Sequence, residues 1–131
     1  MAHAIIEYSA NIEDRLKLDE LIEKIHNAAI NSGVFPTGGM RTRAARRDHY
    51  RIADGHPDNG FVHVLMKLGP GRDVATKKKA QDFIFAAIDE HLLPLVEKWP
   101  LAVSFEMVEL PENRINQNNI HDYLKARKDA G

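Results

Sequence analysis

The chain has 131 residues, with 18 Lys and Arg against 19 Asp and Glu, so its formal net charge is −1. This length suits a single domain spanning 1–131 that can bury a core, and the balanced charge gives no general attraction to nucleic acid or to a membrane surface. There is no cysteine, which excludes disulfides and thiolate chemistry. With no secretory signal and no apolar run of about 20 residues, the default expectation is a soluble cytoplasmic protein.

The first eight residues predict a β-strand whose side chains alternate between two faces, with Ala4, Ile6 and Tyr8 on one and His3, Ile5 and Glu7 on the other. This strand leaves no room for a disordered tail, so the backbone amine should lie at the end of an ordered element. An α-amino group titrates near about 7.7–8.0, and burial or a neighbouring cation lowers its pKa further. The amine is therefore a candidate general base. The alternative, an inert terminus on a core strand, is favoured by these patterns alone.

The rest of the chain alternates amphipathic helices with strands. Apolar residues recur at helical spacing in two long segments and at every second position in three short ones. In chain order we expect a helix over Asp14–Ser32, strands over Met40–Ala45 and Phe61–Leu68, a helix from its N-cap Asp73 to Trp99, a strand over Leu101–Glu109, a short helix over Asn119–Arg127 and a frayed end at 128–131.

This order predicts an α+β fold made of two β-α-β units. Each long helix can cross back over the sheet, so the two units should give one four-stranded sheet with both long helices on one face, plus a short C-terminal helix. The other face would keep apolar residues such as Ile5 and Val62. Burying that face against another copy is the natural solution, so we expect an oligomer.

Short motifs spread over nearly the whole chain carry a resemblance to a known family. They are Glu7-Tyr8-Ser9-Ala10-Asn11-Ile12, Gly33-Val34-Phe35-Pro36, Gly39-Met40-Arg41-Thr42-Arg43, Ala53-Asp54-Gly55, Phe61-Val62-His63, Gly69-Pro70-Gly71-Arg72, Leu101-Ala102-Val103-Ser104-Phe105-Glu106 and Gln117-Asn118-Asn119-Ile120-His121. In this order and at this spacing, the chain resembles the 5-carboxymethyl-2-hydroxymuconate isomerases of the tautomerase superfamily.

The resemblance implies a fold, an assembly and a reaction. Members of the family have a double β-α-β fold, assemble as trimers, and move a proton along a conjugated dicarboxylate in the breakdown of aromatic acids, without a metal or an organic cofactor. Their base is the free amine of an N-terminal proline. Arginines hold the carboxylates of the substrate and the developing enolate. On this sequence Arg41 falls on the strand arginine of the family, and Arg72 falls on the arginine of the glycine-rich turn.

One departure concerns the base itself, because residue 2 is Ala2 where the family has proline. If Met1 is removed, Ala2 offers a primary amine at the same place. If Met1 stays, the only amine lies one residue further out. Two readings therefore remain open: an isomerase that uses this amine, or a related scaffold that has lost the base and binds an anionic small molecule or runs another reaction.

Further candidate residues surround this proposed base. Arg43 shares a strand face with Arg41 and could help it to clamp a carboxylate, while Phe105 could form an apolar wall that keeps the pKa of the amine low. Ion pairing explains the run of five arginines between Arg41 and Arg51 better than nucleic-acid binding does. The histidines lack the spacing of a zinc site, so no metal is expected. His121 is expected to pack within the last helix.

Overall fold

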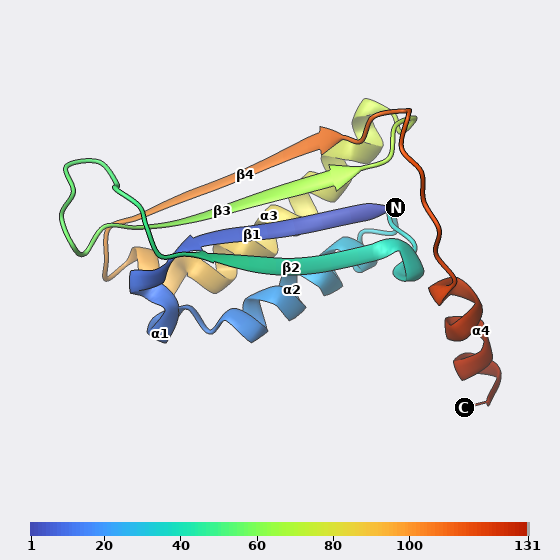
Figure 1. Cartoon of the computed structure of the whole chain (residues 1–131), viewed down its shortest axis with the longest axis horizontal. Coiled ribbons are helices and arrows are strands. Elements are labelled where there is room, and N and C mark those ends of the chain that lie inside the picture. Colours follow the sequence, from blue (N-terminus) through green and yellow to red (C-terminus); the bar gives the residue numbers. More distant parts are fainter. Residues whose placement is uncertain (131) are drawn as a thin grey trace.

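A computed structural model describes residues 1–130 and contains one four-stranded sheet with helices on one face (Figure 1). The strands are β1 (Ala2–Ser9), β2 (Met40–Arg47), β3 (Gly60–Leu68) and β4 (Leu101–Glu109), in the order β2-β1-β3-β4. β1 pairs with β2 and β3 with β4 in parallel, while β1 and β3 are antiparallel. The predicted pair of β-α-β units is confirmed, and β1 lies in the interior of the sheet.

Two long helices, α2 (Leu18–Asn31) and α3 (Val74–Val96), connect the parallel strands and cover one face of the sheet. Asp73 caps α3 as expected, because its side chain accepts a hydrogen bond from the backbone N–H of Thr76 at 2.7 Å. The shorter elements are η1 (Ala10–Ile12), α1 (Glu13–Leu16), η2 (Thr37–Gly39) and α4 (Ile120–Ala130).

The first predicted helix is wrong in one respect, because it is broken at Lys17. The backbone of Lys17 is left-handed, with φ 51° and ψ 58°, and separates α1 from α2. The break frees the carbonyl of Leu16, which accepts a hydrogen bond of 2.7 Å from Nε2–H of the buried His91 on α3. A helix end buried without such a partner would be costly, so α3 compensates the break.

The buried side chains follow the alternation that the sequence predicts, with one correction. Ala4, Ile6 and Tyr8 face the helices. Val62 was expected on the opposite, open face, but it is fully buried under the helices because it pairs with Tyr8 across the antiparallel ladder. The open face instead carries half-buried apolar residues, namely Ile5, Ala45, Phe61 and Leu65.

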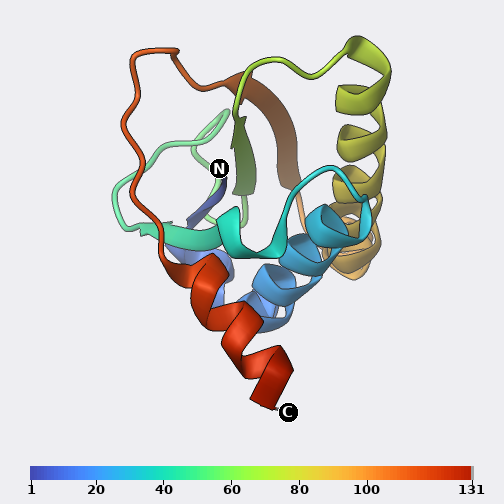
Figure 2. The ribbon, with the colours of Figure 1, turned by 90° about the vertical axis from the view of Figure 1, so that its right-hand side faces the viewer.

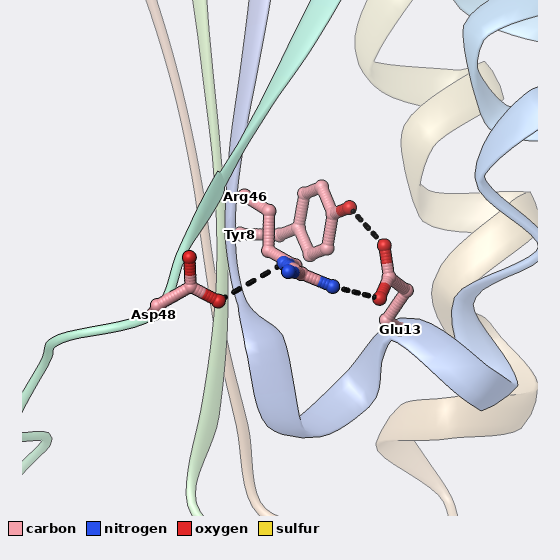
Figure 3. A network of polar contacts seen from close by, with 4 residues as sticks. All are labelled: Tyr8, Glu13, Arg46 and Asp48. Carbon is pink, nitrogen blue, oxygen red and sulfur yellow. Dashed lines mark hydrogen bonds and ion pairs between the residues drawn. The ribbon is translucent and has the colours of Figure 1, made fainter.

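A polar network fixes the end of β1 that is distant from the N-terminus (Figure 3). The Tyr8 hydroxyl donates to Glu13 at 2.9 Å, and the Arg46 guanidinium donates to the same carboxylate at 2.6 Å and approaches Asp48 at 3.0 Å. The hydrogen bond from Arg46, followed by that from Tyr8, lowers the pKa of the Glu13 carboxyl. Arg47 pairs with Glu7, so this half of the arginine run makes ion pairs within the chain.

The chain after β4 crosses to the N-terminal end of β1 before α4 begins (Figures 1 and 2). The expectation of a frayed end from residue 128 is wrong for residues 128–130, because α4 continues to Ala130. Gly131 lies outside the described residues. None of the residues of α4 is fully buried. Within residues 1–130, no helix combines the length and the apolar character that crossing a membrane requires.

Candidate active site

The first residues of the chain are held by packing at the end of β1. Met1 and Ala2 line a small cavity of about 50 Å³. Its other walls come from three segments that are distant in sequence: Phe35, Pro36 and Gly39 before β2, Arg72 after β3, and His121 at the start of α4. Ala2 is only 3% exposed. The amine is therefore fixed at a point where several loops meet, as the sequence predicted for a strand that begins at residue 2.

The environment of the Met1 amine favours its neutral, basic form. Burial lowers its pKa from the ordinary value of 8.0, and the positive charges of Arg72, Arg114 and Arg41 lower it further, in that order. Both causes act in the same direction, because low dielectric and nearby cations each disfavour an ammonium ion. A neutral amine that is available near neutral pH can accept a proton.

The three arginines around the amine lack anionic partners among residues 1–130. Among residues 1–130, none of Arg41, Arg72 and Arg114 forms an ion pair with a carboxylate, whereas Arg46 and Arg47 both do. The Nε atoms of Arg41 and Arg114 are buried without any hydrogen-bond partner in the described chain. Three uncompensated guanidinium groups beside one amine are suited to binding an anion with more than one acidic group.

Arg72 is fixed by the backbone around it. Its Nη1 donates to the carbonyl of Gly69 at 3.0 Å and its Nη2 to the carbonyl of Val34 at 3.3 Å. The guanidinium also lies over the Phe35 ring, 5.1 Å from the ring centroid. These contacts hold Arg72, which follows the glycine-rich turn 69–71, in one orientation at the wall of the cavity, as a preorganised binding group requires.

His3 links two of the arginines of β2, Arg41 and Arg43. Arg41 Nη2 lies 3.1 Å from His3 Nε2, and Arg43 Nη1 lies 3.0 Å from His3 Nδ1. Burial first, and then the charges of Arg41 and Arg43, lower the pKa of the His3 ring. A neutral imidazole has only one acceptor nitrogen, so it satisfies one of the two guanidiniums at most. His3 therefore positions the pair without neutralising its charge.

The C-terminal segment is attached to the loop beside the amine. Asn118 Nδ2 donates to the carbonyl of Gly38 at 2.7 Å, and its Oδ1 accepts from the backbone N–H of Ile120 at 2.8 Å, which starts α4. The His121 ring packs directly on Gly38, where a Cβ would overlap it. The motif 117–121 thus has a structural role, since it closes one side of the cavity, and His121 faces the cavity rather than only the packing of its own helix.

Comparisons with known proteins identify the family. The family model described as 5-carboxymethyl-2-hydroxymuconate isomerase matches residues 2–124. The chain belongs to this family. The 5-carboxymethyl-2-hydroxymuconate Delta-isomerase of Escherichia coli is 36% identical over 126 residues, which cover 95% of this chain and 100% of that protein.

Two solved structures with the same printed activity have the same fold. A 5-carboxymethyl-2-hydroxymuconate isomerase from Deinococcus radiodurans R1 is 32% identical, with a TM-score of 0.88 over 94% of this chain and 93% of that one. A crystal structure of a 5-carboxymethyl-2-hydroxymuconate delta-isomerase is 28% identical, with a TM-score of 0.89 over 95% and 93% of the two chains. The chain is thus a member of an isomerase family in the tautomerase superfamily.

The isomerase fold brings some of the expected site residues together but not all of them. Arg41 and Arg72 lie close enough to the amine to lower its pKa, and Arg43 adjoins Arg41 through His3. Phe105 does not reach this group. It lies on the helix-facing side of β4, level with Val64, and its ring stacks on Phe85 of α3 at a centroid distance of 6.4 Å.

Arg114 is a site residue that no sequence pattern of this isomerase predicted. It lies in a polar run without helical or strand periodicity, so no local pattern distinguishes it. Its only sequence signal is its place a few residues before the motif 117–121. Among residues 1–130, no group of His, Asp and Glu could hold a metal ion. A larger cavity of about 360 Å³ lies beside Arg15, His91 and Trp99. That cavity lies beside α1, at the opposite end of the sheet from the amine (Figure 1), so it is separate from the candidate site.

Proposed function

We propose that this protein is a cytoplasmic isomerase of aromatic-acid catabolism that ketonises 5-carboxymethyl-2-hydroxymuconate, with the N-terminal amine as its base. The observation that carries the proposal is the amine of lowered pKa near three arginines that form no ion pair with any residue the structure describes. The named substrate suits this arrangement, since a muconate has two carboxylates and the carboxymethyl group adds a third. The family membership and the activity printed for the relatives support the reaction class.

The reaction needs only a proton carrier and groups that bind negative charge. The neutral amine accepts the proton of the substrate hydroxyl, so the O–H bond breaks and charge spreads along the conjugated chain. The electron pair shifts the double bonds, a C–H bond forms further along the chain as the amine returns the proton, and the composition of the substrate is unchanged. Arg41 and Arg72 bind carboxylates and stabilise the developing enolate, whose negative charge is largest between the two proton transfers.

The identity of the base depends on how Met1 is processed. If Met1 is removed, the primary amine belongs to Ala2, at the start of β1. If Met1 is retained, the base is the amine of Met1, which lies beside Gly39. The pKa of this amine is lowered by its surroundings. A primary amine differs from the proline amine of the family in its freer rotation, so the surrounding packing has to supply the orientation that a ring would provide. Intact mass spectrometry distinguishes the two forms.

We further propose that the protein works as a homotrimer. The cavity of about 50 Å³ is well below the roughly 300 Å³ or more that a small-molecule site usually occupies. The open sheet face carries half-buried Ile5, Phe61 and Leu65, which a second copy would cover. A neighbouring copy that covers this face would extend the wall of the site, and the family resemblance implies three copies.

The test is the ultraviolet-monitored ketonisation of 5-carboxymethyl-2-hydroxymuconate at neutral pH, with the mass of the protein and its oligomeric state measured on the same sample. We expect a rate far above the buffer background from a trimer. The absence of proline at residue 2 motivates one alternative, a binding protein without a base. A folded trimer that binds the substrate through Arg41 but does not accelerate its ketonisation would establish that alternative.

A further inference from the structure

We propose that Arg114 binds the carboxymethyl carboxylate of the substrate, the acidic group that a plain hydroxymuconate lacks. This inference rests on the proposed function and extends it from the reaction to the selection of the substrate. It assigns a specificity role to a segment outside the two β-α-β units.

The position of Arg114 follows from the way its segment is held at both ends. The segment between β4 and α4 begins where the backbone N–H of Leu110 donates to the carbonyl of Leu68, the last residue of β3, at 2.7 Å. It ends where Asn118 donates to the carbonyl of Gly38 at 2.7 Å. Between these two attachments the chain passes beside the N-terminus (Figures 1 and 2). Arg114 is therefore held near the amine by a strap that is attached at both ends.

The guanidinium of Arg114 lies near the amine and forms no ion pair within the described part of the chain. Its Nη1 donates to the carbonyl of Pro111 at 3.1 Å, and its Nη2 lies 3.4 Å from where a Cβ on Gly69 would stand, next to the turn that carries Arg72. Its Nε is buried without a partner among the described residues. A buried donor that stays unsatisfied in the free protein is costly, and an anionic ligand that accepts from it would remove that cost.

Counting charges separates the role of Arg114 from that of the other two arginines. Arg41 on β2 and Arg72 on the turn after β3 can hold the two carboxylates of a muconate. The third guanidinium of the group comes from a separate element, and the third carboxylate of the substrate comes from a separate branch. Matching the two predicts that Arg114 contacts a carboxylate of the carboxymethyl derivative and has no carboxylate to contact in the parent compound.

The experiment compares 5-carboxymethyl-2-hydroxymuconate with 2-hydroxymuconate for the wild-type protein, Arg114→Gln and the matched control Arg127→Gln, which removes an exposed arginine on α4. We expect Arg114→Gln to lose about tenfold to a hundredfold in kcat/KM for the carboxymethyl substrate, mostly through KM. Because Arg114 also lowers the pKa of the amine, its loss affects both substrates to the same extent through the base, so the two are compared as a ratio: kcat/KM for 2-hydroxymuconate should fall much less, and the preference for the carboxymethyl substrate should drop by about tenfold or more. Arg114→Lys, which keeps the charge but not the planar fork, should fall between the two.

An equal loss on both substrates would overturn the assignment and indicate a role that is not specific to the carboxymethyl group. No loss on either substrate would also overturn it. A wild-type protein that turns over neither substrate would refute the proposed function instead. Calorimetry then tests Arg114 alone, with tricarballylate against glutarate, which differ by one carboxylate. If the assignment is right, Arg114→Gln weakens the binding of tricarballylate selectively; unchanged binding of both, or the same weakening of both, contradicts it.

Discussion

Replacing Arg41 by glutamine should separate a loss of function from a loss of stability. Arg41 makes no ion pair among the described residues, its Nε is buried without a partner, and its Nη2 contacts only His3. Charge-assisted hydrogen bonds to a carboxylate contribute about 1.5–3 kcal/mol. At about 1.36 kcal/mol for each factor of ten, their loss should lower kcat/KM roughly 10- to 150-fold.

The same substitution should leave the folded state almost unchanged. It removes one unpaired cation from beside two others, and one unsatisfied buried donor, so we expect the free energy of unfolding to change by no more than about 0.5 kcal/mol. The matched control is Arg47→Gln, on the same strand and the same face but paired with Glu7. This control should keep its activity and lose at most about 1 kcal/mol of stability, as partly exposed ion pairs do.

The assays are the ultraviolet-monitored ketonisation and urea unfolding, measured on both variants and on wild type. The reasoning would be refuted if Arg41→Gln kept the wild-type kcat/KM. It would also be refuted if the loss of activity followed a loss of unfolding free energy of several kcal/mol, because Arg41 would then be a structural residue.

Three further predictions concern the amine, the strap and the distant end of the sheet. In the proposed mechanism the Met1 amine acts in its neutral form, and its pKa is lowered from 8.0, so kcat/KM should rise as pH increases through that pKa. Arg72→Gln removes a cation that disfavours the ammonium, and should move this limb of the pH–rate profile to higher pH. Asn118→Ala removes the hydrogen bond to Gly38, so amide hydrogen exchange should accelerate over 119–130 while the exchange of β1 stays unchanged. Tyr8→Phe should lower the melting temperature by a few degrees without an effect on kcat/KM. This difference in melting temperature from wild type should shrink as pH falls below 4.5 through the lowered pKa of Glu13, because a protonated carboxyl accepts the Tyr8 hydrogen bond less well.

The sheet was predictable because alternation is a local signal. Ala4, Ile6 and Tyr8 share a parity on β1, and that parity alone places them on one face. On β3 the residues Val62, Val64, Met66 and Leu68 share one parity, whereas His63 and Lys67 have the other, so the apolar parity indicates the buried face. The expectation that Val62 lies on the open face was wrong because it disregarded this parity, which the pairing of Val62 with Tyr8 places under the helices.

The break at Lys17 shows a limit of local patterns. Lysine carries no signal for a left-handed backbone, and the break shows in the sequence only as a step of five residues, instead of three or four, between the apolar core positions Leu16 and Leu21. The compensating hydrogen bond comes from His91, 75 residues away. Only the packing of α3 against the α1–α2 junction makes this conformation favourable.

The candidate site was predictable where it rests on strands and motifs. Arg41 and Arg72 were singled out through the motifs that contain them, and the structure brings both to the amine. Phe105 was assigned to the same group although its level along β4 is set by the pairing with Val64. Arg114 was missed because its position depends on two anchors outside its own segment, at Leu68 and Gly38, that no periodicity reveals.

The most direct test of the amine as the base is to block it. Carbamylation near neutral pH modifies α-amines in preference to lysines, because an amine of lowered pKa is neutral there while lysine is charged. Mass spectrometry then counts the blocked termini and locates them at Met1 or Ala2. We expect the ketonisation rate to fall in proportion to the blocked fraction, with the fold and the trimer intact. A fully blocked protein that keeps its full rate would contradict an N-terminal base and require another residue to move the proton.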